Sequence, residues 1–428
     1  MWTRFLLLIG IATGMRAQQY DPMDLLRRVQ ARIARSLERL PRYMCTETID
    51  RTVENPDIHD LRTACDQGPA RRATHLATSD RLRLDVGIAS NVEMYSWVGE
   101  SRFDDRDLLD IVREGAISTG SFAAFLVAIF RAGYARFTYN GETTENGRKV
   151  AEFGYSVSHD DSHYLYGNPG HQVVTGYSGT FLVDPSISDL VQLVVRTSQL
   201  PRETLACYAS TTLEYMRVHF GESDFLLPKE SRLRIYQTDG GESENRTVFS
   251  NCHEFLGDST ISFSPPNSSP GDASHGSVSP ALTIPPGLRF RVALSQGIDT
   301  STAAAGDPIK ARLIEPIKNH SKVLAPARTP VTARIVRIRQ YYSGGATAIA
   351  LDIKLETVEI AGVRVQLAAA PDTGKAFQKS KTGTLQRSID LGTLRNLEDR
   401  SASYVFRNVQ PHYLIGSGLE SGWVTGTP

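Results

Sequence analysis

The sequence predicts a mainly β protein, with an α+β N-terminal domain followed by a linker and a second β domain. Stretches of alternating apolar and polar residues recur from Tyr43 to Phe263 and again from Leu288 onward, which is the pattern of half-buried strands. Between them, residues 264–281 are rich in Pro, Ser and Gly and show no period, as interdomain linkers do. A length of 428 residues fits two or three domains.

The composition excludes several classes of protein. Hydrophobic residues make up 40% of the chain and charged residues 22%, and 47 basic side chains balance 47 acidic ones. These values are ordinary for a globular protein and exclude a disordered chain or a multi-span membrane protein. A strongly basic nucleic-acid binder is excluded as well, because such proteins carry net positive charge.

The first 17 residues predict a secretory signal peptide. Arg4 precedes the apolar run from Phe5 to Ala12, and Ala17 supplies a small residue at the cleavage site. Cleavage after Gly14 is the alternative, since Met15 is a poor residue three positions before the cut, and a buried N-terminal strand is the competing structural interpretation. The run is too short to span a bilayer. We therefore expect an exported protein, periplasmic or extracellular, with no membrane span in its mature chain.

The four cysteines, Cys45, Cys65, Cys207 and Cys252, predict disulfides, because an oxidising compartment pairs thiols. Four cysteines allow three connectivities. Their spacing favours the two local pairs Cys45–Cys65 and Cys207–Cys252. No closely spaced C-x-x-C pair is present, so neither a zinc site nor a nucleophilic cysteine is expected.

A helix is predicted from Asp21 to Leu40, with Asp21 as its cap and Pro41 as its end. An apolar stripe runs along one face, and arginines surround it; the stripe is Leu26, Val29, Ile33, Leu37 and Leu40. Two interpretations follow: a basic amphipathic helix on an anionic membrane surface, or a helix whose stripe packs on the domain core. The second is favoured.

The N-terminal domain, residues 18–263, is predicted as a curled antiparallel sheet around a helix. Its strands include 81–86, 93–98, 135–139, 150–157, 180–183, 190–195, 213–220, 232–236, 246–250 and 259–263. Turn signals stand at Asn140-Gly141, Asn146-Gly147 and Asp239-Gly240-Gly241. One helix is predicted at Asp105–Arg113. A second, Ser121–Phe130, is apolar nearly all round and is therefore predicted to be buried.

The C-terminal domain, residues 282–428, is predicted as a β-barrel or sandwich, because no helical period competes with its alternating segments. These segments are 288–294, 330–336, 349–355, 363–367, 404–407 and 413–415. Residues 371–400 are polar and predict a loose excursion.

Two resemblances accompany this organisation. Gly176–Pro185, followed by Leu190-Val-Gln-Leu, resembles a strand pair of the lipoprotein-carrier half-barrel family (LolA/LolB-like folds), over roughly residues 40–263. The resemblance implies a concave apolar face that holds a lipid or acyl chain. The C-terminal region, with Ile284-Pro-Pro-Gly287 and Leu324-Ala-Pro326, is similar to the β-barrel domain of TrbI-type conjugation-channel proteins. It lacks that group's second turn glycine, so the resemblance implies a fold only.

Five aromatic side chains are candidates for an apolar ligand site: Trp97, Phe125, Phe153, Tyr155 and Phe181. Ordinary core packing is the competing interpretation of each. The cluster of His159, His163 and His171 lacks the H-E-x-x-H pattern of a zinc helix and predicts a solvated turn. No nucleophile elbow or phosphate-binding loop is present, and no catalytic residue is assigned.

The sequence therefore predicts a non-enzymatic, exported cell-envelope protein without cofactor or metal. It would bind a lipid-like apolar ligand or an envelope protein partner. The first alternative is a structural or assembly component of an envelope complex. The second is a secreted hydrolase whose catalytic residues are scattered along the chain.

Overall fold

The computed structural model describes residues 20–56, 65, 74–89, 92–100, 103, 108–112, 114–168, 171–197, 200–254, 284–372 and 400–427. The predicted signal peptide, the predicted linker and the predicted strand at 259–263 lie outside these residues. So does most of the predicted excursion at 371–400. Within the described residues the chain is mainly β, as predicted, with one long helix and several short helical segments.

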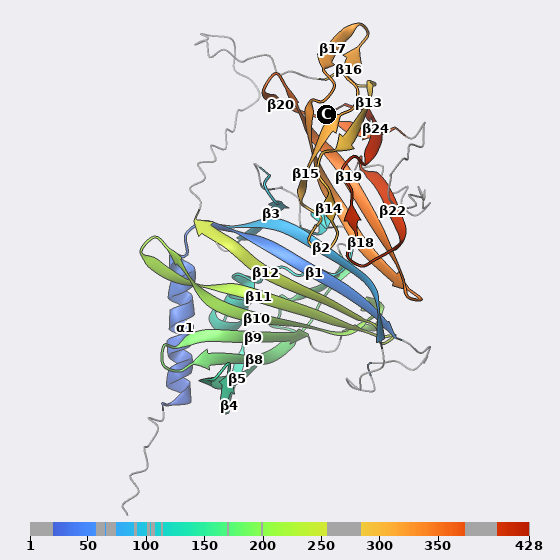
Figure 1. Cartoon of the computed structure of the whole chain (residues 1–428). Coiled ribbons are helices and arrows are strands. Elements are labelled where there is room, and N and C mark those ends of the chain that lie inside the picture. Colours follow the sequence, from blue (N-terminus) through green and yellow to red (C-terminus); the bar gives the residue numbers. More distant parts are fainter. Residues whose placement is uncertain are drawn as a thin grey trace, which may run out of the picture.

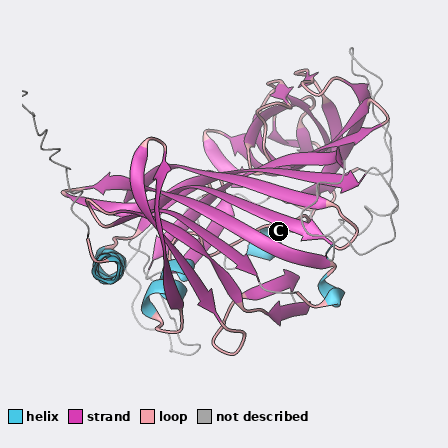
Figure 2. Ribbon diagram, turned by 90° about the horizontal axis from the view of Figure 1, so that it is seen from below, coloured by secondary structure: helices cyan, strands magenta, loops and turns pink. Residues whose placement is uncertain are grey.

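The N-terminal part builds one open antiparallel sheet, in the order β4-β5-β8-β9-β10-β11-β12-β1-β2-β3. Its strands are β1 (Tyr43–Pro56), β2 (Thr74–Ala89), β3 (Val92–Trp97), β4 (Arg136–Glu145), β5 (Arg148–Val157), β8 (Tyr177–Asp184), β9 (Asp189–Thr197), β10 (Ala206–Phe220), β11 (Ser223–Gln237) and β12 (Glu242–Glu254). A separate hairpin joins β6 (Leu165–Asn168) to β7 (His171–Val174). Figure 2 shows the sheet curving over the helical segments, which confirms the predicted half-barrel.

Helix α1 (Pro22–Arg39) begins at Asp21, whose carboxylate accepts the Met23 amide at 2.8 Å. It runs past the ends of the strands (Figure 1). The predicted stripe is buried in the core except for Leu40, which is only half-buried, and Leu25 joins it. The stripe therefore packs on the domain core, as the favoured interpretation states.

The predicted buried helix at Ser121–Phe130 is confirmed in place but differs in form. It consists of α3 (Ala124–Leu126) and a π-helical turn, η2 (Val127–Arg131). The helix predicted at Asp105–Arg113 is described only as α2 (Leu108–Ile111), and a short 3₁₀ turn, η3 (Arg202–Thr204), precedes β10. Of the turn signals, Asn140-Gly141 was wrong, because it forms a bulge inside β4 rather than a turn. Gly141 adopts the positive φ of 113° that this bulge requires.

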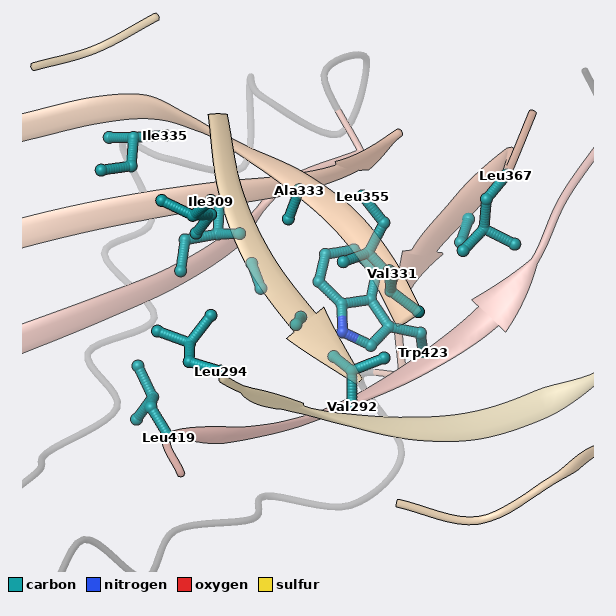
Figure 3. Close-up of a cluster of buried hydrophobic side chains, with 14 of the residues drawn as sticks. Val292, Leu294, Ile309, Val331, Ala333, Ile335, Leu355, Leu367, Leu419 and Trp423 are labelled. Carbon is teal, nitrogen blue, oxygen red and sulfur yellow. The ribbon is translucent and has the colours of Figure 1, made fainter. Parts of the chain in front are cut away.

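The C-terminal part is barrel-like, because its strands pair in two runs that the chain joins by passing directly from β20 to β21. β13 pairs with β15, β15 with β18, β18 with β19, β19 with β20, β21 with β24 and β24 with β13. The strands are β13 (Arg289–Leu294), β15 (Pro308–Leu313), β18 (Pro330–Ser343), β19 (Ala346–Ile360), β20 (Val363–Gln366), β21 (Ala369–Pro371), β22 (Ala402–Val409) and β24 (Glu420–Thr425). Small pairs are β14 (Ile298–Asp299) with β23 (Leu414–Ile415), and β16 (Ile317–Asn319) with β17 (Lys322–Ala325). Figure 3 shows Trp423 surrounded by aliphatic side chains in the barrel core.

The two parts share one continuous sheet, which the sequence did not predict. β18 of the barrel pairs with β2 of the half-barrel, from Arg339↔Asp80 to Tyr341↔Thr78. Beside this pairing, the Ala305 carbonyl accepts the Arg83 amide at 2.7 Å, and the Ala305 amide donates to the Arg81 carbonyl at 2.8 Å. The barrel is therefore fixed to the half-barrel through backbone hydrogen bonds.

Both disulfides are formed, but the predicted pairing was wrong. Cys45 pairs with Cys252, and Cys65 pairs with Cys207. The physical reason is the strand order: β12, the last strand of the half-barrel, lies directly beside β1. Cys45 and Cys252 therefore have Cα atoms 4.1 Å apart despite a sequence separation of 207 residues.

Candidate functional site

A charged cleft lies where the half-barrel and the barrel meet. It has a volume of about 170 Å³. Strands β1, β2, β3, β18 and β19 contribute to its walls, together with the segments around Glu114 and Ala305. Clefts at such junctions are common ligand sites.

Asp80 is the centre of the first ion-pair group. Arg51 on β1 donates two hydrogen bonds to its carboxylate, at 2.6 and 2.8 Å, and a third to the Glu114 carbonyl at 2.6 Å. Arg339 on β18 donates to the same carboxylate at 2.9 and 2.7 Å. The side chains of Arg51 and Asp80 are only 7% and 8% exposed, so water screens this group weakly.

The charge of Asp80 also acts on the titration of Arg339. Burial lowers the pKa of the Arg339 guanidinium, but the charge and hydrogen bonds of Asp80 and the charge of Glu114 outweigh this and raise it above its ordinary value. Arg337 behaves in the same way next to Asp352, and its pKa is raised too. Both guanidinium groups therefore remain charged at any physiological pH.

Arg334 joins the two parts from the barrel side. Its guanidinium donates to the Val98 carbonyl of the half-barrel at 2.8 Å and to the Gly306 carbonyl at 2.6 Å. It also donates two hydrogen bonds to the Glu356 carboxylate on β19, one from Nε to Oε1 and one from Nη2 to Oε2 at 3.2 Å. A buried cation held by carbonyls from both sides fixes their relative position.

Asp352 leaves one hydrogen-bond acceptor in the cleft unused. Its Oδ2 accepts from Arg337 Nε at 2.8 Å. Its Oδ1 is buried and has no hydrogen-bond partner in the described part of the chain. Next to it on the lining, Lys354 is exposed and has no ion pair with any described residue. The cleft lining thus includes one buried acceptor and one exposed ammonium group that no described residue pairs.

The apolar wall of the cleft includes Trp97, Leu82 and Ala305. Gly306 follows Ala305 with a φ of +104°, and a Cβ there would collide with the carbonyl oxygen of Arg83 and approach the Trp97 ring. The backbone of the barrel therefore fits against β2 so closely that only glycine is accommodated at this position.

Trp97 is thus the one predicted ligand residue that lies in the cleft. The other four, Phe125, Phe153, Tyr155 and Phe181, belong to a separate core cluster beneath α1. Phe153 and Phe181 are 0% exposed, and their rings stack with centroids 5.2 Å apart. The structure does not bring the five predicted residues together into one site.

The chain's own side chains fill the concave face at these positions. Phe130 of η2 meets the Phe181 ring edge-on at 5.1 Å, and the Tyr155 hydroxyl donates to the Val194 carbonyl at 2.9 Å. Burial raises the pKa of Tyr155, and it raises that of neighbouring Tyr164 to about 12. Whether Phe125, Phe153, Tyr155 and Phe181 contact an apolar ligand stays a prediction.

A buried acidic residue lies deeper in the half-barrel. Glu47 on β1 points into the core that contains Ile49 and Leu84, and it is 4% exposed. Burial, followed by the charge of Glu93, raises the pKa of Glu47 well above its ordinary value. Glu93 itself accepts the amides of Gly120 and Phe122, at 2.7 and 3.1 Å, and so ties the start of the buried helical segment to β3.

The histidine cluster forms an exposed turn. His159 and Asp160 lie in the turn after β5, and His171 begins β7. Within the described residues, no three His, Cys, Asp or Glu side chains are grouped to hold a metal ion. Among all the residues that the structure describes, no helix is long and apolar enough to cross a membrane.

The sequence interpretation missed the charged residues of the cleft. One signal was available: Ala333-Arg-Ile-Val-Arg-Ile-Arg339 places three arginines on a strand that is otherwise apolar. Arginines on a buried strand need acidic partners. Arg334 and Arg337 find theirs, Glu356 and Asp352, on neighbouring β19. Only the partners of Arg339, Asp80 and Glu114, depend on the pairing of β2 with β18.

The chain is similar, at low identity, to several solved structures. An outer membrane lipoprotein-sorting protein domain from Vibrio parahaemolyticus is 11% identical, with a TM-score of 0.26, covering 53% of this chain and 90% of that one. A DUF1329 family protein from Desulfovibrio piger is 8% identical, with a TM-score of 0.29, covering 56% and 96%. A LolA superfamily protein from Nitrosomonas europaea is 11% identical, with a TM-score of 0.26, covering 54% and 95%.

No family model matches the chain, and no curated protein matches its sequence. Two of these structures are described as a lipoprotein-sorting domain and a LolA superfamily protein, the group that the sequence of the half-barrel resembles. The resemblance of the barrel to TrbI-type domains stays a prediction.

Proposed function

We propose that this chain is an exported, non-enzymatic binding protein of the cell envelope, and that the charged cleft anchors a protein partner. The two disulfides, Cys45–Cys252 and Cys65–Cys207, support an oxidising compartment. The observation that carries the proposal is the unused acceptor Asp352 Oδ1 beside the exposed ammonium of Lys354.

The size and chemistry of the cleft favour a protein partner over a lipid. Sites for drug-sized ligands measure about 300–1,000 Å³, whereas this cleft measures about 170 Å³. It therefore has room for one side chain or a chain end. A peptide supplies both an N–H donor for Asp352 and a carbonyl or carboxylate for Lys354, while an acyl chain supplies neither.

Site-specific photo-crosslinking tests this function. A photoreactive amino acid replaces Ser401, which lines the cleft, with a matched variant at Lys322, an exposed residue on β17. In the intact envelope, the variant at 401 is expected to give an adduct of one defined protein mass, and the variant at 322 is not. Asp352→Asn or Lys354→Gln in the 401 background should weaken that adduct. Adducts of lipid mass, or equal adducts at both positions, contradict the proposal.

A second candidate function is the binding of an apolar ligand on the concave face. The observation that favours it is the π-helical turn Val127–Arg131 within the buried helical segment, since such turns are frequent at functional sites. Binding would require this segment to move away from Phe153 and Phe181. Titration with a fluorescent fatty acid tests it: saturable binding that Phe125→Trp weakens would support a ligand site beside α3.

A further inference from the structure

The exposed side of α1 carries a row of arginines that is separate from the cleft. Arg28, Arg35 and Arg39 are all exposed, whereas Leu26, Val29 and Ile33 on the other side are buried. At about 100° per residue, the three arginines fall within an arc of roughly 40° and span roughly 16 Å along the axis. We call these three residues the arginine row; Arg42, also exposed, follows just beyond the helix.

The acidic residues of α1 do not neutralise this row. Asp24 pairs with Arg27 on the same helix, and Glu38 lies 3.7 Å from Arg131. Arg32 is held by Asp189 at 2.5 Å. Within the described residues, no carboxylate lies within ion-pair distance of Arg28, Arg35, Arg39 or Arg42; the Arg28 Nε contacts only the Ser188 hydroxyl, at 3.3 Å.

The row lies on the side of α1 away from its buried residues, and among the described residues Arg28 alone of the row contacts the half-barrel, at Ser188. Figure 2 looks along α1 and shows it at the margin of the curved sheet, with the sheet on one side only. Two exposed apolar side chains stand near the start of the helix, Met23 at 48% and Ile187 at 50% exposure. Ile187 precedes Ser188, the residue that Arg28 contacts.

We infer that the arginine row docks the protein on an anionic phospholipid surface. A straight row of cations without an adjoining pocket suits a plane of negative charge, because each arginine reaches a phosphate independently. The buried stripe excludes insertion of the helix into the bilayer, so the attraction is electrostatic. The binding should therefore weaken steeply with salt.

The test is vesicle co-sedimentation of the full mature chain. The probes are vesicles of phosphatidylglycerol mixed with phosphatidylcholine, and vesicles of phosphatidylcholine alone. We expect the chain to bind the vesicles that contain phosphatidylglycerol at about 0.01 M salt, where the Debye length is about 30 Å. This binding should be lost at about 1 M salt, where the Debye length is about 3 Å. Binding to phosphatidylcholine alone, or no binding at low salt, would overturn the inference; the second outcome leaves an acidic protein as the partner.

A matched pair of triple variants separates the row from net charge. The first is Arg28→Gln, Arg35→Gln and Arg39→Gln. The control is Lys310→Gln, Arg312→Gln and Lys318→Gln, three exposed cations of the barrel. The row variant should lower the partition coefficient by roughly 100-fold, at about fivefold per arginine, and the control by less than about threefold. Equal losses would overturn the inference; circular dichroism verifies that both variants keep their folded structure.

Discussion

Arg339 of the barrel donates two hydrogen bonds, of 2.9 and 2.7 Å, to Asp80 of the half-barrel. Because Arg51 also donates to both oxygens of this carboxylate, one acidic side chain compensates two cations, of which Arg51 is buried. The pairing of β1 with β2 brings Arg51 to Asp80, whereas the junction between the two parts brings Arg339 to it.

Asp80→Asn should destabilise the protein by about 3–5 kcal/mol, because it leaves buried Arg51 without its counter-ion. Urea unfolding of the whole chain measures this loss. Asp50→Asn is the matched control, since Asp50 pairs with Arg81 in a partly exposed pair, and such pairs contribute about 0–1 kcal/mol. A similar loss of unfolding free energy in the two variants would contradict the prediction that the buried Asp80 pair stabilises the protein more than the exposed Asp50 pair.

Gly306→Ala should disturb the junction, because its Cβ would collide with the Arg83 carbonyl and approach the Trp97 ring. We expect a change in the fluorescence of Trp97 together with a loss of stability. Gly287→Ala serves for comparison. Gly287 also has a positive φ, of 84°, but no atom lies within 4 Å of the added Cβ, so only backbone strain of about 1–3 kcal/mol applies. An unchanged fluorescence in Gly306→Ala would contradict the close contact.

Peptide mapping without reduction should recover the linked peptides Cys45–Cys252 and Cys65–Cys207. These links close loops of 207 and 142 residues, for which loop entropy predicts a stabilisation of roughly 5 kcal/mol each. Replacing both cysteines of one link by alanine should lower the unfolding midpoint accordingly. Recovery of a Cys45–Cys65 peptide would contradict the strand order β12-β1-β2.

Stability should fall as pH rises through the titration of Glu47. The raised pKa of Glu47 means that the folded state keeps its proton at pH values where the unfolded state has lost it. The stabilisation is therefore complete below the ordinary glutamate pKa and is lost as pH rises to the raised value, by up to about 1.4 kcal/mol per pH unit. Glu47→Gln should remove this slope, whereas Glu214→Gln, at a half-exposed position, should keep it. Urea midpoints across the pH range measure both slopes.

Limited proteolysis should cut first between about Ser264 and Ala281, where the composition predicts a linker. The two fragments should remain associated, because β2 and β18 are paired and Asp80 joins Arg51 to Arg339. Size-exclusion chromatography after cleavage, under native conditions and then in urea, measures this association. A first cut within the half-barrel or barrel would refute the two-domain prediction, and separation under native conditions would refute the rigid junction.

The sequence by itself determined the local elements of this protein. The Asp21 cap and the leucine and valine stripe define α1, and alternating residues define strands such as β2, β5 and β18. These features depend on neighbours a few residues away, so their period is readable in the chain. The apolar segment around Phe125 was also recognised as buried, because apolar side chains on all its faces leave it no solvent-facing side.

Only the tertiary structure decided which distant residues meet. The pairing of β12 with β1 brings Cys252 to Cys45, and the pairing of β18 with β2 brings Arg339 to Asp80. Strand pairing uses backbone groups that every residue carries, so nothing in the sequence near Asp80 identifies its partner strand. The same holds for Trp97, whose aromatic character was visible in the sequence but whose place in the cleft depends on the close approach of Gly306.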